Sequence, residues 1–113
     1  MVESPLTRDL RFDLPALLEL VRREEGVKLV FIANPNNPTG NLFDIDSLEA
    51  IIQASPGIVV IDEAYAPFTD ASFLPRIQNY ANVVVMRTVS KLGLAGLRLG
   101  YLVGSDKILN ELN

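Results

Sequence analysis

The chain has 113 residues, a length that suits a single domain with one hydrophobic core. With 49% apolar and 21% charged residues, the composition is that of a globular protein rather than a disordered or fibrous one. The 14 acidic and 10 basic side chains give a formal net charge of −4, which disfavours nucleic acid as a partner.

Histidine and cysteine are both absent from the sequence, and this limits its chemistry. Disulfides, thiolate nucleophiles, imidazole bases and the commonest zinc ligands are excluded, so we expect no metal site. Any catalysis must use lysine, carboxylates, tyrosine, hydroxyls or a bound cofactor. Residues 1–11 lack the apolar run of a secretory signal, and no stretch reaches the roughly 18 apolar residues of a membrane span. We therefore expect a cytoplasmic protein with no membrane partner.

Two segments have the pattern of amphipathic helices. The first is predicted to begin after Asp13, with Pro15 in its first turn, and to end at Gly26. The second, over 44–54, places its isoleucines and leucine on one face and is terminated by a Ser-Pro-Gly run. A weaker helix is predicted over 72–80, where Pro75 is compatible only with the first turn.

Short apolar runs between these helices predict strands over 27–33, 58–61 and 83–86. The run 58–61 is continuously apolar, which indicates a strand covered on both faces. A further strand is predicted over 97–103, followed by a helix over 106–112. Strands separated by helical crossovers imply an α/β fold, which we expect to have three layers, with a mainly parallel sheet and flanking helices.

Polar residues follow each of the three central strands. The first strand is followed by a turn-rich loop at 34–40, the second by Asp62 and Tyr65, and the third by Ser90 and Lys91. Ligands of parallel sheets bind beyond the carboxyl ends of the strands, and neighbouring strands lie about 4.8 Å apart. An acid, a phenol, an amine and the guanidinium of Arg98 are therefore expected to reach one small pocket.

These segments resemble the aspartate-aminotransferase superfamily of pyridoxal-phosphate enzymes, and most closely the histidinol-phosphate aminotransferases. The resemblance rests on Asn-Pro-Asn-Asn-Pro-Thr-Gly at 34–40, Val-Ile-Asp-Glu-Ala-Tyr at 60–65, and Ser-Lys followed by Gly-Leu-Ala-Gly-Leu-Arg-Leu-Gly-Tyr within 90–101. It covers essentially the whole chain but only the later part of the family's large, cofactor-binding domain. The resemblance thus implies a fragment of a fold type I enzyme, without the N-terminal segment and the C-terminal small domain.

The resemblance also implies roles for individual residues. Lys91 would form the covalent bond to the cofactor aldehyde and later move a proton at the substrate α-carbon, which requires an uncharged, desolvated amine. Asp62 would face the pyridine nitrogen and keep it protonated, so that the ring can accept electrons. Tyr65 and Asn37 would donate hydrogen bonds to the phenolic oxygen of the ring.

The phosphate of the cofactor would be held by Arg98 together with Ser90 and Thr88. A guanidinium forms paired, charge-assisted hydrogen bonds with phosphate that a lysine would not reproduce. The glycines between Lys91 and Arg98 would let the backbone turn closely around this group. Because Thr88 and Ser90 alternate with Val89, we expect both hydroxyls on one side of an extended segment.

Each of these residues also has a plainer interpretation. Lys91 could be a solvated surface charge, Asp62 a cap of a turn, and Tyr65 a side chain packed on the sheet with its hydroxyl in water. Thr88 and Ser90 could be ordinary polar residues at a strand end. The choice of Asn37 over its neighbour Asn36 rests on motif alignment, and Glu63 is interpreted as a structural or exposed carboxylate.

The resemblance implies an aminotransferase that uses histidinol phosphate as amino donor and 2-oxoglutarate as the 2-oxo acid acceptor, in histidine biosynthesis. The parent enzyme would be a homodimer, whereas the fragment alone is expected to be inactive. A decarboxylase or lyase of the same fold, such as a threonine-phosphate decarboxylase, is an alternative because it shares these motifs. An inert α/β module is an alternative of another class.

Overall fold

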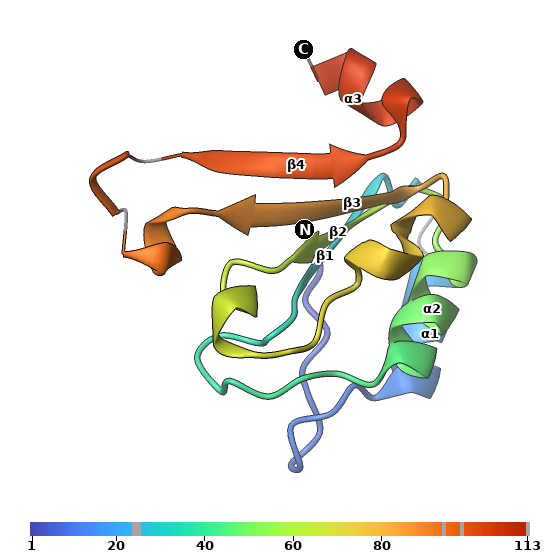
Figure 1. Ribbon diagram of the computed structural model, residues 1–113. Helices are drawn as coiled ribbons and strands as arrows, with labels where there is room; N and C mark the ends of the chain where they lie inside the picture. The colour runs from blue at the N-terminus through green and yellow to red at the C-terminus, as the bar shows by residue number, and fades with distance from the viewer. Residues whose placement is uncertain (24–25, 94, 98, 113) are drawn as a thin grey trace.

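The computed structural model describes residues 1–23, 26–93, 95–97 and 99–112, in which helices alternate with the strands of one sheet (Figure 1). In chain order, the helices and strands are α1 (Leu14–Arg23), β1 (Leu29–Ala33), α2 (Ile45–Ala54), β2 (Ile58–Asp62), β3 (Val83–Thr88), β4 (Gly100–Gly104) and α3 (Asp106–Leu112). Short 3-10 helices are η1 (Ala66–Phe68), η2 (Leu74–Asn79), η3 (Ser90–Leu92) and η4 (Ala95–Leu97).

The described residues form a four-stranded sheet in the order β1-β2-β3-β4. Strands β1, β2 and β3 are parallel, and β4 is antiparallel to β3. Asp62, the last residue of β2, is in register with Ala33 of β1 and Met86 of β3. The predicted α/β class with a mainly parallel sheet is confirmed, and the carboxyl ends of three strands lie at one edge.

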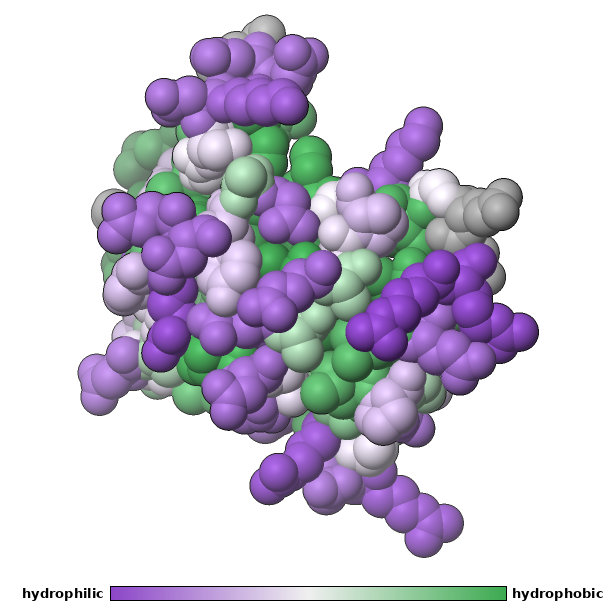
Figure 2. All heavy atoms as spheres, turned by 90° about the vertical axis from the view of Figure 1, so that its right-hand side faces the viewer, coloured by the Kyte–Doolittle hydropathy of each residue, from purple (hydrophilic) through white to green (hydrophobic). Residues whose placement is uncertain are grey.

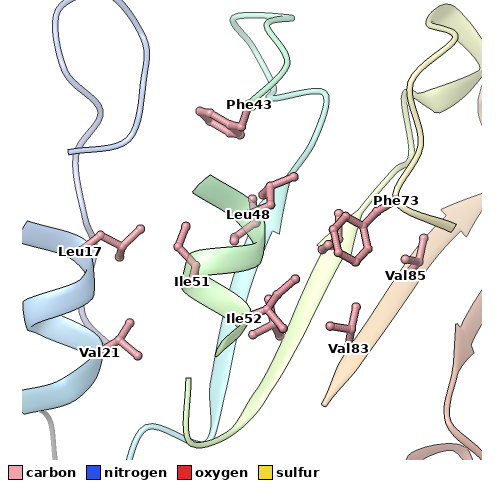
Figure 3. Packing of buried hydrophobic residues seen from close by; sticks show 12 residues of the cluster. Leu17, Val21, Phe43, Leu48, Ile51, Ile52, Phe73, Val83 and Val85 are labelled. Atoms are coloured by element: carbon pink, nitrogen blue, oxygen red, sulfur yellow. The ribbon is translucent and has the colours of Figure 1, made fainter. Parts of the chain in front are cut away.

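The hydrophobic core lies between the sheet and the pair of helices α1 and α2 (Figure 3). The spacing of Leu48, Ile51 and Ile52 places all three on the face of α2 that packs inward, and each is at most 1% exposed. From the sheet, the alternate residues of β2 and β3 point to the same side, because successive side chains of a strand face opposite ways. They are Val59, Ile61, Val83 and Val85.

The outward face of α1 and α2 is mainly hydrophilic (Figure 2). Exposed charged residues of α1 include Glu19 and Arg23, which form an (i, i+4) ion pair at 3.0 Å. This agrees with the predicted amphipathic helices. Among the described residues, no helix is long and apolar enough to cross a membrane.

The opposite face of the sheet is only partly covered, which corrects the expectation that 58–61 is buried on both faces. Val59 and Ile61 are buried, but Ile58 and Val60 point the other way and are only half-buried. On the same face of β1, Phe31 is 56% exposed. The physical reason is that, in the described part of the chain, α3 contacts β4 rather than the middle of the sheet.

Two further expectations about local structure need correction. The segment predicted as a helix over 72–80 forms the shorter 3-10 helix η2, in which Pro75 lies in the first turn. The strand predicted over 97–103 begins later, at Gly100, because η4 precedes it. Proline within the first turn and tight turns of three residues both favour 3-10 geometry over a longer regular element.

The N-terminal cap of α2 supplies a test of the fold. The backbone N–H and the hydroxyl of Ser47 donate to the Asp44 carboxylate at 2.8 and 2.9 Å, and these hydrogen bonds lower the pKa of Asp44. Asp44→Ala should lower the free energy of unfolding by about 1 kcal/mol at about pH 7. Because the pKa is lowered in the folded state, this stability is present above about pH 4 and is lost as the pH falls through the folded value. Urea titrations of both proteins should therefore converge at acid pH, and a constant difference would contradict the capping role.

A second test concerns the turn between α2 and β2. A Cβ atom at Gly57 would overlap the backbone carbonyl of Lys28, which accepts a hydrogen bond from the Ile58 N–H at 2.9 Å. Gly57→Ala should therefore cost about 1–3 kcal/mol of unfolding free energy, since backbone must shift. Gly96→Ala is the matched control, because a Cβ there meets no atom of the described residues within 4 Å. Thermal unfolding of the two variants measures the difference, and equal midpoints would contradict the overlap.

Candidate functional site

The loop that follows β1 is tied to the neighbouring strand by Asn34. Its N–H donates to the Asp62 carbonyl at 2.9 Å, and its buried side-chain oxygen accepts from the Phe43 N–H at 2.9 Å. Within the loop, the Asn36 amide donates to the Thr39 hydroxyl at 2.6 Å, and the peptide bonds before both prolines are cis. The side-chain amide of Asn36 is thus engaged inside the loop, whereas Asn37 is exposed to solvent.

Asp62 ends β2 with its side chain on the partly covered face of the sheet. One carboxylate oxygen accepts a hydrogen bond from the Ala64 N–H at 2.9 Å, which is the turn-capping contact of the plainer interpretation. The half-buried carboxylate also lines a cavity of about 650 Å³. Other residues that line this cavity come from β3, β4 and α3 and include Met86, Thr88, Leu102, Leu109 and Leu112. The cavity is of the size that small-molecule sites have.

Lys91 and Tyr65 lie against each other. The Lys91 ammonium nitrogen is 4.8 Å from the centroid of the Tyr65 ring, a distance at which a cation is attracted to an aromatic face. Tyr65 is half-buried and lies beside Phe68, with ring centroids 6.2 Å apart. Lys91 itself is exposed, so the expected desolvated environment is not formed by the described residues.

Thr88 and Ser90 are joined by a hydrogen bond, but they do not lie on one extended segment, so that prediction is wrong. Thr88 ends β3, Val89 has helical dihedral angles, and Ser90 begins the 3-10 helix η3. The Thr88 hydroxyl accepts from the Ser90 N–H and donates to the Leu99 carbonyl, both at 3.1 Å. The chain turns here because strand pairing with β4 ends at Thr88. Arg98, the expected phosphate ligand, lies outside the described residues.

The predicted residues thus gather at one edge of the sheet but not in a single pocket. Asp62 and Thr88 line the same cavity, whereas Lys91 and Tyr65 form a neighbouring pair. Both groups lie beyond the carboxyl ends of β2 and β3, because these strands are parallel and in register. Asn37 belongs to the loop beyond β1 at the same edge.

Sequence reasoning missed a buried ion pair directly beside these residues. Glu63 has a fully buried side chain, and its carboxylate accepts two hydrogen bonds from the Arg87 guanidinium, at 3.0 and 2.7 Å. Burial lowers the pKa of Arg87, but hydrogen bonds and attraction from Glu63 and Tyr101 more than offset this and raise it. Glu63 is therefore structural, and the alternative of an exposed carboxylate is excluded. One sequence signal was available: Arg87 continues the inward positions of Val83 and Val85, where a charge needs a partner.

The sequence is similar to known proteins along its whole length. The family model described as aminotransferase class I and II matches residues 1–113. Histidinol-phosphate aminotransferase 2 of Nitrosococcus oceani is 54% identical over 107 residues, which are 95% of this chain and 29% of that protein.

Two solved structures share the fold. The histidinol-phosphate aminotransferase of Clostridium acetobutylicum superposes with a TM-score of 0.84 and 28% identity, over 94% of this chain and 33% of that one. The L-threonine-O-3-phosphate decarboxylase of Porphyromonas gingivalis superposes with a TM-score of 0.65 and 28% identity, over 74% of this chain and 28% of that one. This chain spans about three-tenths of the length of the Nitrosococcus relative. Since the family model covers every residue, the chain belongs to the aminotransferase class I and II family.

Proposed function

We propose that residues 1–113 are part of the pyridoxal-phosphate-binding large domain of an aminotransferase. The observation that carries this proposal is the placement of Lys91, Asp62 and Tyr65 at one edge of the sheet, in a chain of the aminotransferase class I and II family. Cytoplasmic location and a homodimeric assembly of the whole protein belong to the same proposal. The family resemblance supports both the assembly and the location.

The residues present fit pyridoxal phosphate by their chemistry. The cofactor has an aldehyde, a pyridine nitrogen, a phenolic oxygen and a phosphate, which need an amine, an acid and hydroxyl donors. Lys91, Asp62, Tyr65 and the Thr88 and Ser90 hydroxyls supply these groups at one edge. When bound, the cofactor supplies an electron sink for the bond broken at the substrate α-carbon.

The family resemblance supports the following roles for the protein groups. Lys91 would hold the cofactor at its aldehyde. Once the amino group of the substrate had displaced it there, the freed Lys91 amine would carry the proton of the substrate α-carbon, a task for which Arg is too basic. Asp62 keeps a proton on the pyridine nitrogen and is held in place by the Ala64 N–H. Tyr65 and Asn37 would orient the phenolic oxygen, and Ser90 and Arg98 would hold the phosphate. Thr88 would join them after its hydroxyl turned away from the Leu99 carbonyl, to which it donates in this structure.

For the substrates, we propose histidinol phosphate and 2-oxoglutarate. The support is the name of the relative from Nitrosococcus oceani, at 54% identity. A decarboxylase is the second candidate, supported by the fold shared with the Porphyromonas gingivalis enzyme at 28% identity. Assays of the whole protein distinguish the two candidate functions. Amino transfer from histidinol phosphate would support the aminotransferase, and release of CO2 from threonine phosphate would support the decarboxylase.

Covalent trapping tests the role of Lys91. Borohydride reduction in the presence of pyridoxal phosphate should label Lys91 in preference to Lys28 and Lys107, because only Lys91 lies at the edge with Asp62. Peptide mass mapping locates the label. Lys91→Arg should abolish the main label, whereas the matched variant Lys107→Arg should leave it unchanged. Label spread evenly over the three lysines would refute the assignment.

The role of Asp62 is tested by a substitution that keeps its shape. Asp62→Asn retains an oxygen for the Ala64 N–H but removes the charge that faces the pyridine nitrogen. The affinity for pyridoxal phosphate should fall by about tenfold or more, the value of a hydrogen bond to a charged group. Asp46→Asn, at an exposed position of α2, is the control. Equal affinities of the two variants, measured by absorbance titration, would remove Asp62 from the site.

A further inference from the structure

The Glu63–Arg87 pair joins the two strands that carry the proposed site. Glu63 directly follows Asp62, and Arg87 directly precedes Thr88. Successive residues point to opposite faces of the sheet, so the ion pair lies on the core side while Asp62 and Thr88 face the cavity. Arg87 is itself among the residues that line the cavity, whereas Glu63 is one residue away from it along the chain.

The carboxylate of Glu63 accepts hydrogen bonds from three residues in two segments. Arg87 donates from β3 at 3.0 and 2.7 Å, and Glu63 accepts the Ser72 hydroxyl at 3.0 Å and the Phe73 N–H at 2.5 Å. Arg87 also donates to the Ser72 hydroxyl at 2.9 Å, which closes a triangle. The described residues contain no buried side-chain polar atom without a hydrogen-bond partner, so this network is complete.

A complete buried pair of this kind acts on geometry more than on stability. Desolvation of two charges roughly cancels their attraction, and an apolar pair of similar volume is often as stable. A planar guanidinium, however, accepts only a narrow range of positions for its carboxylate. The backbone N–H of Glu63 donates to the Met86 carbonyl at 2.8 Å, and this hydrogen bond restrains the same paired ends of β2 and β3.

We propose that Glu63, Arg87 and Ser72 are positioning residues that set the placement of Asp62 relative to the turn that carries Ser90 and Lys91. The consequence for the cofactor rests on the proposed function, whereas the consequence for the geometry does not. Without this network, backbone hydrogen bonds still pair the ends of β2 and β3. The side chains at these ends and the turn after Thr88, however, lose the restraint that the Glu63–Arg87 pair provides on the core side of the sheet.

Hydrogen exchange reads this placement without any cofactor. The Ala64 N–H reports on Asp62, and the Ser90 N–H reports on Thr88, because each donates to that side chain. The Arg87→Lys variant keeps the positive charge but loses the planar guanidinium that donates two hydrogen bonds to Glu63. In this variant we expect exchange at both amides to accelerate by about tenfold or more. Ser72→Ala removes only the hydroxyl and should accelerate exchange at the same two amides to a smaller extent. This variant replaces Arg87→Lys in the test if Arg87→Lys does not fold.

Two matched controls separate positioning from general destabilisation. Ile51→Val loosens the core at a fully buried site, and Arg76→Lys alters the more exposed Arg76–Glu49 ion pair of 3.3 Å. Neither should accelerate exchange at Ala64 and Ser90 more than at the core amides of β2 and β3. If Arg87→Lys and Ser72→Ala behave like Ile51→Val, with uniform acceleration, the positioning role is wrong.

Trapping with pyridoxal phosphate then tests the consequence for the cofactor. Borohydride labelling of Lys91 should fall by about tenfold in Arg87→Lys and stay unchanged in Arg76→Lys. Loss of local protection together with unchanged labelling would overturn the link to Lys91. If the unmodified chain takes no label at Lys91, the proposed function fails, and the exchange data still decide whether Glu63 and Arg87 position the two strand ends.

Discussion

The parallel pairing of β2 with β1 and β3 is the constraint on which the remaining features depend. It brings three carboxyl ends to one edge, with Asp62 in register with Ala33 and Met86. The pairing extends past the strands, because the Asn34 N–H donates to Asp62 and the Glu63 N–H donates to Met86. Residues that are far apart in the sequence thereby become neighbours, and Lys91 lies at the same edge as Asp62. A shift of this register would separate the acid from the amine.

Alternation along the strands gives neighbouring residues different tasks. Asp62 faces the cavity and Glu63 faces the core, although the two carboxylates are consecutive. On the adjoining strand, Thr88 and Arg87 both line the cavity, and the guanidinium of Arg87 donates to Glu63. Polar groups on the cavity side are left with capacity for a ligand, while those on the core side satisfy one another. The buried charge of Glu63 is thus neutralised by Arg87, whose side chain is only partly buried.

The two faces of the sheet differ in how completely they are covered. Helices α1 and α2 bury one face, whereas Phe31 on the other is 56% exposed and α3 lies against β4. Lys91 lies in η3, beyond the end of β3, and is exposed. The relatives that share the sequence are longer, and this chain spans 29% of the Nitrosococcus protein.

Much of the fold could be read from the sequence alone, and the residues of the proposed site were chosen from sequence motifs. The helix that begins after Asp44, the apolar runs of β2 and β3, and the order of the motifs depend on residues close together in the chain, and such local patterns determine secondary structure directly. The partnership of Glu63 with Arg87, the turn at Ser90 and the half-covered face of β2 depend on contacts between distant segments. Hydrophobic periodicity predicts that a side chain is buried, but it does not predict which side chains it contacts. Only the tertiary structure therefore decided these features.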